Sequence, residues 1–188
     1  LASLTAVLRP HLRTLYLIHR DVDQLAAEAH RLGGRAGIES PGFEFWYDWV
    51  AVGVDLTDKP VDDEQLARLL HLPAFRYVIR LSLADTRVTD RGLEMLANRP
   101  SIYLLDVSRT KITDHCLASI AKMQGLVILN LSGTSISDRG IETLIAHAGS
   151  SHLRSVSLRD TEVSQATAER LRKALFQATV TLSPAKQR

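Results

Sequence analysis

The chain has 188 residues, 45% of them hydrophobic and 23% charged, which is ordinary for one folded domain with a real hydrophobic core. Its 23 Lys and Arg against 21 Asp and Glu leave a formal net charge of +2, which favours neither nucleic acid nor an acidic membrane surface as a partner. The single cysteine, Cys116, excludes an internal disulfide framework and a cysteine zinc site. Because no apolar run reaches the length of a membrane span, we expect no direct membrane insertion. We expect a cytoplasmic location, unless a signal or anchor precedes Leu1.

Residues 1–50 are predicted to cap the N-terminal end of the domain. Asp21 and Gln24 suggest a capping box, "LAAEAHRL" continues with helical spacing, and Gly33 and Gly34 end the helix. "RAGIE" then predicts a short strand. The aromatic segment "FEFWYDW", residues 43–49, predicts a plug over the first repeat. Stacking of nucleobases on these rings is the alternative, and it is disfavoured because no dense Lys or Arg cluster accompanies them.

Residues 51–182 are dominated by an internal repeat. Each unit begins with two apolar residues separated by one position, and the units follow at steps of 27, 24, 24, 27 and 24 residues. In the first five units another apolar residue stands three residues before the pair. No unit can bury its apolar face alone, so we predict a stack of about five to six units. We expect the longer steps to place extra residues between a helix and the next strand. The pairs are Val54/Leu56, Leu81/Leu83, Leu105/Val107, Leu129/Leu131, Val156/Leu158 and Val180/Leu182.

Each strand is followed by a turn and a helix of recurring sequence, seen in "TRVTDRGL", "TKITDHCL" and "TSISDRGI". The apolar spacing changes there from period two to helical spacing. Asp62, Thr89, Thr113, Ser137 and Ser164 occupy the predicted helix N-caps. Asp63, Asp90, Asp114 and Asp138 follow them, and Gln165 replaces the aspartate in the last unit. We interpret these carboxylates as scaffold residues that compensate the helix dipole, in preference to a calcium-binding ladder.

These units have the pattern "LxxLxLxxTxVTDxGL", and the block from Val54 to Leu182 resembles leucine-rich repeat proteins, especially short-repeat bacterial members. A weaker resemblance is to mitochondrial coupling factor B-like proteins. The departures are "DKP" at residues 58–60 and Gln165, both at the ends of the array. The resemblance implies an α/β solenoid with a parallel sheet on its concave side. It also implies a partner-binding scaffold and carries over no catalytic residue.

The search for chemical motifs returns no nucleotide-binding loop, nucleophile elbow or metalloprotease helix. The seven histidines are scattered, and His147 and His152 flank a polar loop. Cys116 takes the position that Gly92 and Gly140 occupy in neighbouring units, which favours a packed thiol over a nucleophile. We therefore assign no catalytic residue, no metal and no cofactor.

The outward positions of the strands are the candidate binding surface. One column is small and polar and runs from Asp55 to Thr181. Beside it, apolar residues gather over the middle units, where an exposed apolar patch would indicate a protein partner; cover by the N-terminal segment is the alternative. The candidate partner-binding residues are Ile79, Arg80, Tyr103, Leu104, Asp106, Val127, Ile128 and Asn130.

At the C-terminal end, "AERLRKALFQATVTLSP" predicts a helix and a last strand, and residues 183–188 a tail. The sequence thus favours a non-catalytic scaffold that binds a protein through its concave face and leading strand edge, and it predicts no nucleic-acid partner. An assembly factor for a larger complex is a narrower form of the same reading. The rivals are an enzyme with a site in the cap, around Asp48 and His30, and a recognition module cut from a longer chain.

Overall fold

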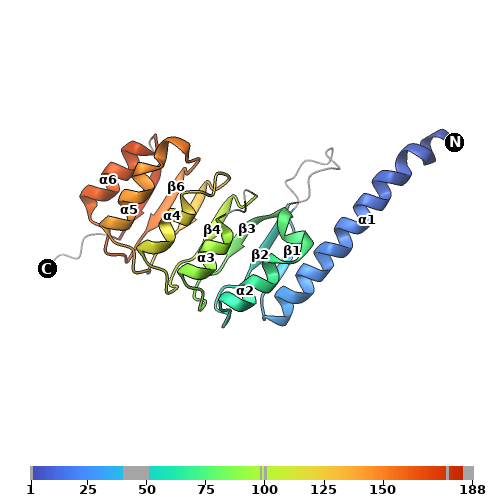
Figure 1. Cartoon of the computed structure of the whole chain (residues 1–188), viewed down its shortest axis with the longest axis horizontal. Helices are drawn as coiled ribbons and strands as arrows, with labels where there is room; N and C mark the ends of the chain where they lie inside the picture. Colours follow the sequence, from blue (N-terminus) through green and yellow to red (C-terminus); the bar gives the residue numbers. More distant parts are fainter. Residues whose placement is uncertain (1, 40–50, 98, 100, 177, 184–188) are drawn as a thin grey trace.

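The computed structural model describes residues 2–39, 51–97, 99, 101–176 and 178–183, with side chains from Leu17 onward. Within these residues the chain forms one seven-stranded sheet in sequential order, with helices along one face (Figure 1). The strands are β1 (Arg35–Ile38), β2 (Val52–Asp55), β3 (Val78–Ser82), β4 (Leu104–Asp106), β5 (Ile128–Asn130), β6 (Ser155–Leu158) and β7 (Thr179–Leu182). The helices are α1 (Ala2–Arg31), α2 (Asp63–Leu70), α3 (Asp90–Leu96), α4 (Leu117–Ile120), α5 (Asp138–Ala146) and α6 (Gln165–Ala174).

The sheet from β2 to β7 is parallel, as the repeat predicts, and only β1 pairs antiparallel with its neighbour in the described chain. The predicted alignment of the units is confirmed residue by residue, since Leu105 pairs with Leu81 on one side and with Leu129 on the other. The apolar pairs of β2 to β6 are all buried. In β7, at the open end of the stack, Val180 and Leu182 are only partly buried. Stacking therefore supplies the core, and within the described residues no further unit packs over β7.

The two 27-residue steps keep the strand register and lengthen the return from helix to strand. After α2, the return contains a 3₁₀ turn at Pro73–Tyr77, which buries Phe75. After α5, it contains a 3₁₀ turn at Ala148–Ser150. The returns after α3 and α4 are shorter and lead to β4 and β5 without such a turn in their described residues. The predicted placement of the additional residues is thus confirmed.

The N-terminal end of the stack is covered by α1. Its residues Val22, Leu25 and Ala29 are buried, and the helix packs against α2, β1, β2 and the 3₁₀ turn before β3. The predicted capping box at Asp21 is wrong, because α1 runs without interruption from Ala2 to Arg31. Ile18 already packs against the core one turn before Asp21, so the apolar stripe does not begin there.

The end of α1 agrees with the prediction from its glycines. Gly33 has φ of +81°, a backbone conformation that favours glycine and ends a helix. Strand β1 follows at once, where "RAGIE" predicts it. The aromatic segment of residues 43–49 lies outside the described residues, so the predicted plug stays a prediction, as does the tail beyond Ser183.

Candidate partner-binding surface

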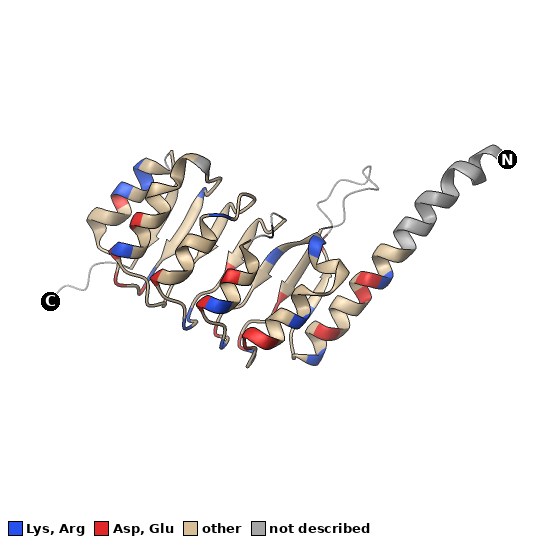
Figure 2. Cartoon of the chain, viewed as in Figure 1, with Lys and Arg blue, Asp and Glu red and all other residues tan. Residues whose placement is uncertain are grey.

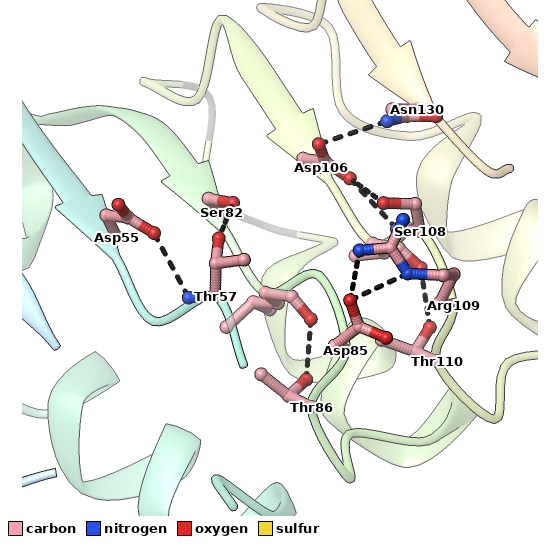
Figure 3. Close-up of polar contacts among 12 residues, drawn as sticks. Asp55, Thr57, Ser82, Asp85, Thr86, Asp106, Ser108, Arg109, Thr110 and Asn130 are labelled. Carbon is pink, nitrogen blue, oxygen red and sulfur yellow. Dashed lines mark hydrogen bonds and ion pairs between the residues drawn. The ribbon is translucent and has the colours of Figure 1, made fainter. Parts of the chain in front are cut away.

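The turns after the strands are held by hydrogen bonds within each unit. In successive units the threonine hydroxyl donates to the carbonyl oxygen three residues earlier, at 2.6 Å from Thr86 to Leu83 and from Thr110 to Val107 (Figure 3). The residue before each threonine has a positive φ, for example 56° at Asp85 and 53° at Arg109. Aspartate tolerates this left-handed conformation better than most residues. These threonine hydroxyls therefore hold the turn, and the hydrogen bond that each donates is used within it.

The recurring aspartates bind the next unit, which corrects the interpretation that they only compensate helix dipoles. Asp90 Oδ1 accepts a hydrogen bond from the amide of Thr113 at 2.7 Å, and its Oδ2 accepts one from the Thr113 hydroxyl at 2.6 Å. Asp114 makes the same two contacts with Ser137, at 2.8 and 2.6 Å. The contact from Asp63 to Thr89 and the bond from the Ser164 amide to Asp138 extend the series. The aspartates are scaffold residues, as interpreted, but they act by accepting hydrogen bonds from the next unit. We name this series of contacts the aspartate ladder.

This aspartate ladder also bears on one departure from the repeat, the glutamine at position 165. The amide of Ser164 donates to Asp138, and this contact holds the pKa of the Asp138 carboxyl below its usual range. The following unit carries Gln165 at the aspartate position, where the described chain offers no further unit to bind. The spacing could have indicated the ladder, since each Ser or Thr lies 23 or 26 residues after its aspartate, one less than the repeat.

Cys116 is a packed thiol, as its position predicts. The side chain is buried, and its Sγ lies 3.2 Å from the carbonyl oxygen of Thr113. Burial away from water, with the carboxylate of Asp90 nearby, raises the pKa of this thiol far above its usual range. Because the thiolate is the nucleophilic form, this environment suppresses cysteine chemistry.

The small polar column lies along the strands beside the turns. Asp106 accepts hydrogen bonds from the amide and the hydroxyl of Ser108, and the Asn130 amide donates to its other oxygen at 3.0 Å (Figure 3). Thr57 and Ser82 pair through their hydroxyl groups at 2.8 Å. Much of the hydrogen-bonding capacity of Asp106 is thus satisfied within the protein, and its role in binding stays a prediction.

The predicted apolar residues gather on the strands of the middle units. Ile79 lies in β3, Leu104 begins β4, and Ile128 begins β5, while Tyr103 and Val127 immediately precede their strands. Tyr103 retains 46% of its surface exposed, and the other four are partly exposed. Register pairs Leu104 with Ile128, so these residues form one group, which we name the apolar patch. Arg80 lies beside it, paired in register with Leu104.

A shallow hollow of about 440 Å³ adjoins the apolar patch at the N-terminal end of the face. Its floor includes Gly37 and Gly53, which pair directly across β1 and β2. Two exposed ion pairs border it, Arg35 with Asp55 and Arg80 with Glu39, each with N–O distances of 3.3 Å. Sequence reasoning missed this hollow because β1 lies outside the repeat, and its pairing with β2 is a tertiary contact.

The rival enzyme site in the cap lies mostly outside the described residues and stays a hypothesis. His30 is exposed in the last turn of α1, and Asp48 lies outside the described residues. His147 and His152 are both exposed, and His147 Nδ1 lies 2.8 Å from the carbonyl oxygen of Thr143. Across the residues that the structure describes, no cluster of His, Cys, Asp or Glu is suited to hold a metal ion. None of the described helices is both long and apolar enough to cross a membrane.

Comparisons with known proteins agree with this geometry. A family model described as Leucine Rich repeat matches residues 76–97 and 123–144, each covering a return or its end, a strand, a turn and most of a helix. The chain thus contains leucine-rich repeats and folds as a leucine-rich repeat solenoid. Arrays of this family generally mediate protein–protein interaction, and its members are typically non-enzymatic.

A search of curated proteins found no significant match to this leucine-rich repeat chain. Among solved structures, it is similar to an internalin from Listeria monocytogenes str. 4b F2365, with 15% sequence identity and a TM-score of 0.40. The match covers 61% of this chain and 37% of the internalin chain, so the repeat array spans little more than a third of that protein.

Proposed function

We propose that this leucine-rich repeat protein is a non-catalytic scaffold that binds a protein partner through the apolar patch and the polar positions beside it. The observation that carries the proposal is the partial exposure of Ile79, Tyr103, Leu104, Val127 and Ile128 on the strand face. Apolar residues that lie together at partly exposed positions are typical of protein-binding surfaces.

The packing of the array supports this choice of surface. On each middle strand the neighbouring residue, Leu105 or Leu129, is fully buried, so the repeat itself does not require an apolar side chain at Leu104 or Ile128. The polar positions at the turns are different, because the fold uses their oxygens. Folding of the repeat therefore does not account for the apolar residues of this patch.

The test is the double change Leu104→Glu and Ile128→Glu in an affinity-tagged protein. Partners are captured from the native host with the parent and the variant and identified by mass spectrometry, and the recovered partner is then purified for direct binding by calorimetry. We expect the variant to lose the partner, because two charges would be desolvated against an apolar contact.

The matched control is Phe176→Glu, which places a charge on an apolar residue that is 82% exposed at the C-terminal end of the array, after α6. This variant should bind like the parent. Thermal unfolding of all three proteins separates loss of binding from loss of fold. A double variant that melts like the parent and still binds the purified partner with parental affinity would overturn the proposed surface.

A further inference from the structure

The two edges of the array differ in charge. The helix-to-strand returns, residues 71–77, 97–103, 121–127, 147–154 and 175–178, contain no aspartate or glutamate. They carry four permanently basic residues, Arg76, Arg99, Lys122 and Arg154. The strand-to-helix turns, in contrast, carry both signs of charge, since they lead into the aspartates of the ladder and also contain Arg87, Arg109 and Lys111. Figure 2 shows acidic segments at the helix starts along the lower edge, with basic segments beside them. We name the edge formed by the helix-to-strand returns the return edge, and the edge formed by the strand-to-helix turns the turn edge.

The positive charges of the return edge are not neutralised within the described protein. Arg76 donates to the hydroxyl of Tyr77 at 2.8 Å, and Arg99 donates to the carbonyl oxygen of Leu70 at 2.9 Å, so both contact neutral groups. In the described residues, no carboxylate forms an ion pair with Arg76, Arg99, Lys122 or Arg154. On the turn edge, by comparison, Arg109 is paired with Asp85.

Two arginines mark the ends of the apolar patch along the sheet. Arg80 in β3 pairs in register with Leu104, and Arg154 immediately precedes β6, where its amide donates to the carbonyl oxygen of Val127 at 2.8 Å. Both are exposed. From β3 to β6 there are three strand spacings of about 4.8 Å, or about 14 Å in all. An extended chain that rises about 3.3 Å per residue covers this distance in about four residues.

We infer that the partner segment is an extended acidic–apolar peptide that lies across β3 to β6. Its apolar side chains contact the apolar patch, and carboxylates about four residues apart lie near Arg80 and Arg154. This inference rests on the proposed function and adds the chemistry of the partner. Charge complementarity with the return edge argues for acidic residues. Four of the five residues of the apolar patch are aliphatic and only Tyr103 is aromatic, which argues for a peptide over a nucleic acid, since nucleic-acid surfaces use several aromatic stacking platforms.

The experiment selects phage-displayed random peptides on the purified full chain. Enriched peptides are expected to carry Asp or Glu on both sides of apolar residues, and their binding should weaken with added salt. The charge-reversed variant Arg80→Glu/Arg154→Glu should bind these peptides at least about tenfold more weakly, and selection on it should enrich Lys and Arg in their place. Arg139→Glu, an exposed reversal on α5, is the matched control and should retain parental binding.

Arg154→Glu alone tests the same point if the double variant unfolds, since Arg154 has no ion pair to lose in the described chain. Apolar peptides without acidic residues, bound with equal affinity by the reversed variants, would overturn this inference and leave the proposed function standing. Peptides that bind Leu104→Glu/Ile128→Glu as tightly as the parent would overturn both. Tight binding of a labelled single-stranded oligonucleotide that Arg154→Glu abolishes would also reject the peptide partner.

Discussion

The turn edge and the strand face of this array use side chains in opposite ways. At the turn edge, Asp90 and Asp114 are carboxylates, a residue type that often binds ligands. In each of them, however, both oxygens accept hydrogen bonds from the next unit. On the strand face, Leu104 and Ile128 are aliphatic residues of the type usually found in the core, yet they are only partly buried. The comparison teaches that availability, and not residue type, separates a scaffold residue from a binding residue. A carboxylate whose oxygens are satisfied internally has little capacity left for a ligand.

The strongest test of this comparison is removal of a ladder aspartate. Asp114→Ala leaves the amide and hydroxyl of Ser137 without their acceptor, and we expect a loss of about 2 to 3 kcal/mol in the free energy of unfolding. Urea unfolding followed by circular dichroism measures it. Gln165→Ala, at the same position in the last unit, is the control and should change stability little. A loss of less than about 1 kcal/mol would restore the dipole interpretation.

A second prediction concerns the small residue above each ladder aspartate. An ideal Cβ on Gly140 would lie 2.7 Å from Asp114 Cγ and 2.9 Å from a methyl carbon of Leu117. Gly140→Ala should therefore destabilise the protein by about 1 to 3 kcal/mol through overpacking. The same urea titration measures the change. Gly149→Ala, where a Cβ would meet no atom within 4 Å, is the control. Equal stability of the two variants would show that Asp114 and Leu117 can move to accept the methyl group without loss of stability.

The threonine turns should contribute less per residue. Thr110→Val keeps the shape of the side chain and removes the hydroxyl that donates to Val107 at 2.6 Å. We expect a loss of about 1 kcal/mol, typical of one neutral hydrogen bond, in equilibrium unfolding. Thr179→Val is the control because Thr179 is exposed at the edge of the sheet. An unchanged midpoint for Thr110→Val would mean that the bond does not hold the turn.

The strand face should tolerate changes that the turn edge does not. Leu104→Glu/Ile128→Glu is expected to shift the free energy of unfolding by no more than about 1 kcal/mol, because both side chains reach solvent beside the buried Leu105 and Leu129. Thermal melts measure it before any partner is known. A loss of several kcal/mol would show that another part of the chain covers the apolar patch.

The smallest effect is expected at the exposed ion pair of the turns. The Arg109 guanidinium donates to Asp85 and lowers the pKa of this carboxyl from its ordinary value of 3.8. A lowered folded pKa gives a contribution that is present above the unfolded value and is lost as pH falls through the folded one. The stability difference between the parent and Asp85→Asn should therefore be constant near neutral pH and shrink only under acid. A difference that grows on acidification would contradict this sign.

Much of the fold was predictable because each unit repeats the same strand, turn and helix with the same apolar spacing. The strand pairs, the helix starts at Asp62, Thr113 and Ser137, and the placement of the additional residues of the long steps all follow from spacing and capping chemistry. Thr89 lies at its predicted N-cap, but its side chain makes no capping bond, and its hydroxyl donates to Asp63. The start of α1 was not predictable from Asp21, since a capping signature is local and the helix is set by a longer apolar stripe.

The sequence by itself determined the stack, its register and which residues form the core, because apolar periodicity specifies a buried face wherever the units repeat. Only the tertiary structure decided how the polar residues are used. The partners of Asp90 and Asp114 belong to the next unit, and in the described chain Arg109 of the turns has an ion pair whereas the four basic residues of the return edge have none. Hydrogen bonds and ion pairs depend on distances of a few ångströms between units, and a repeat pattern alone does not supply them.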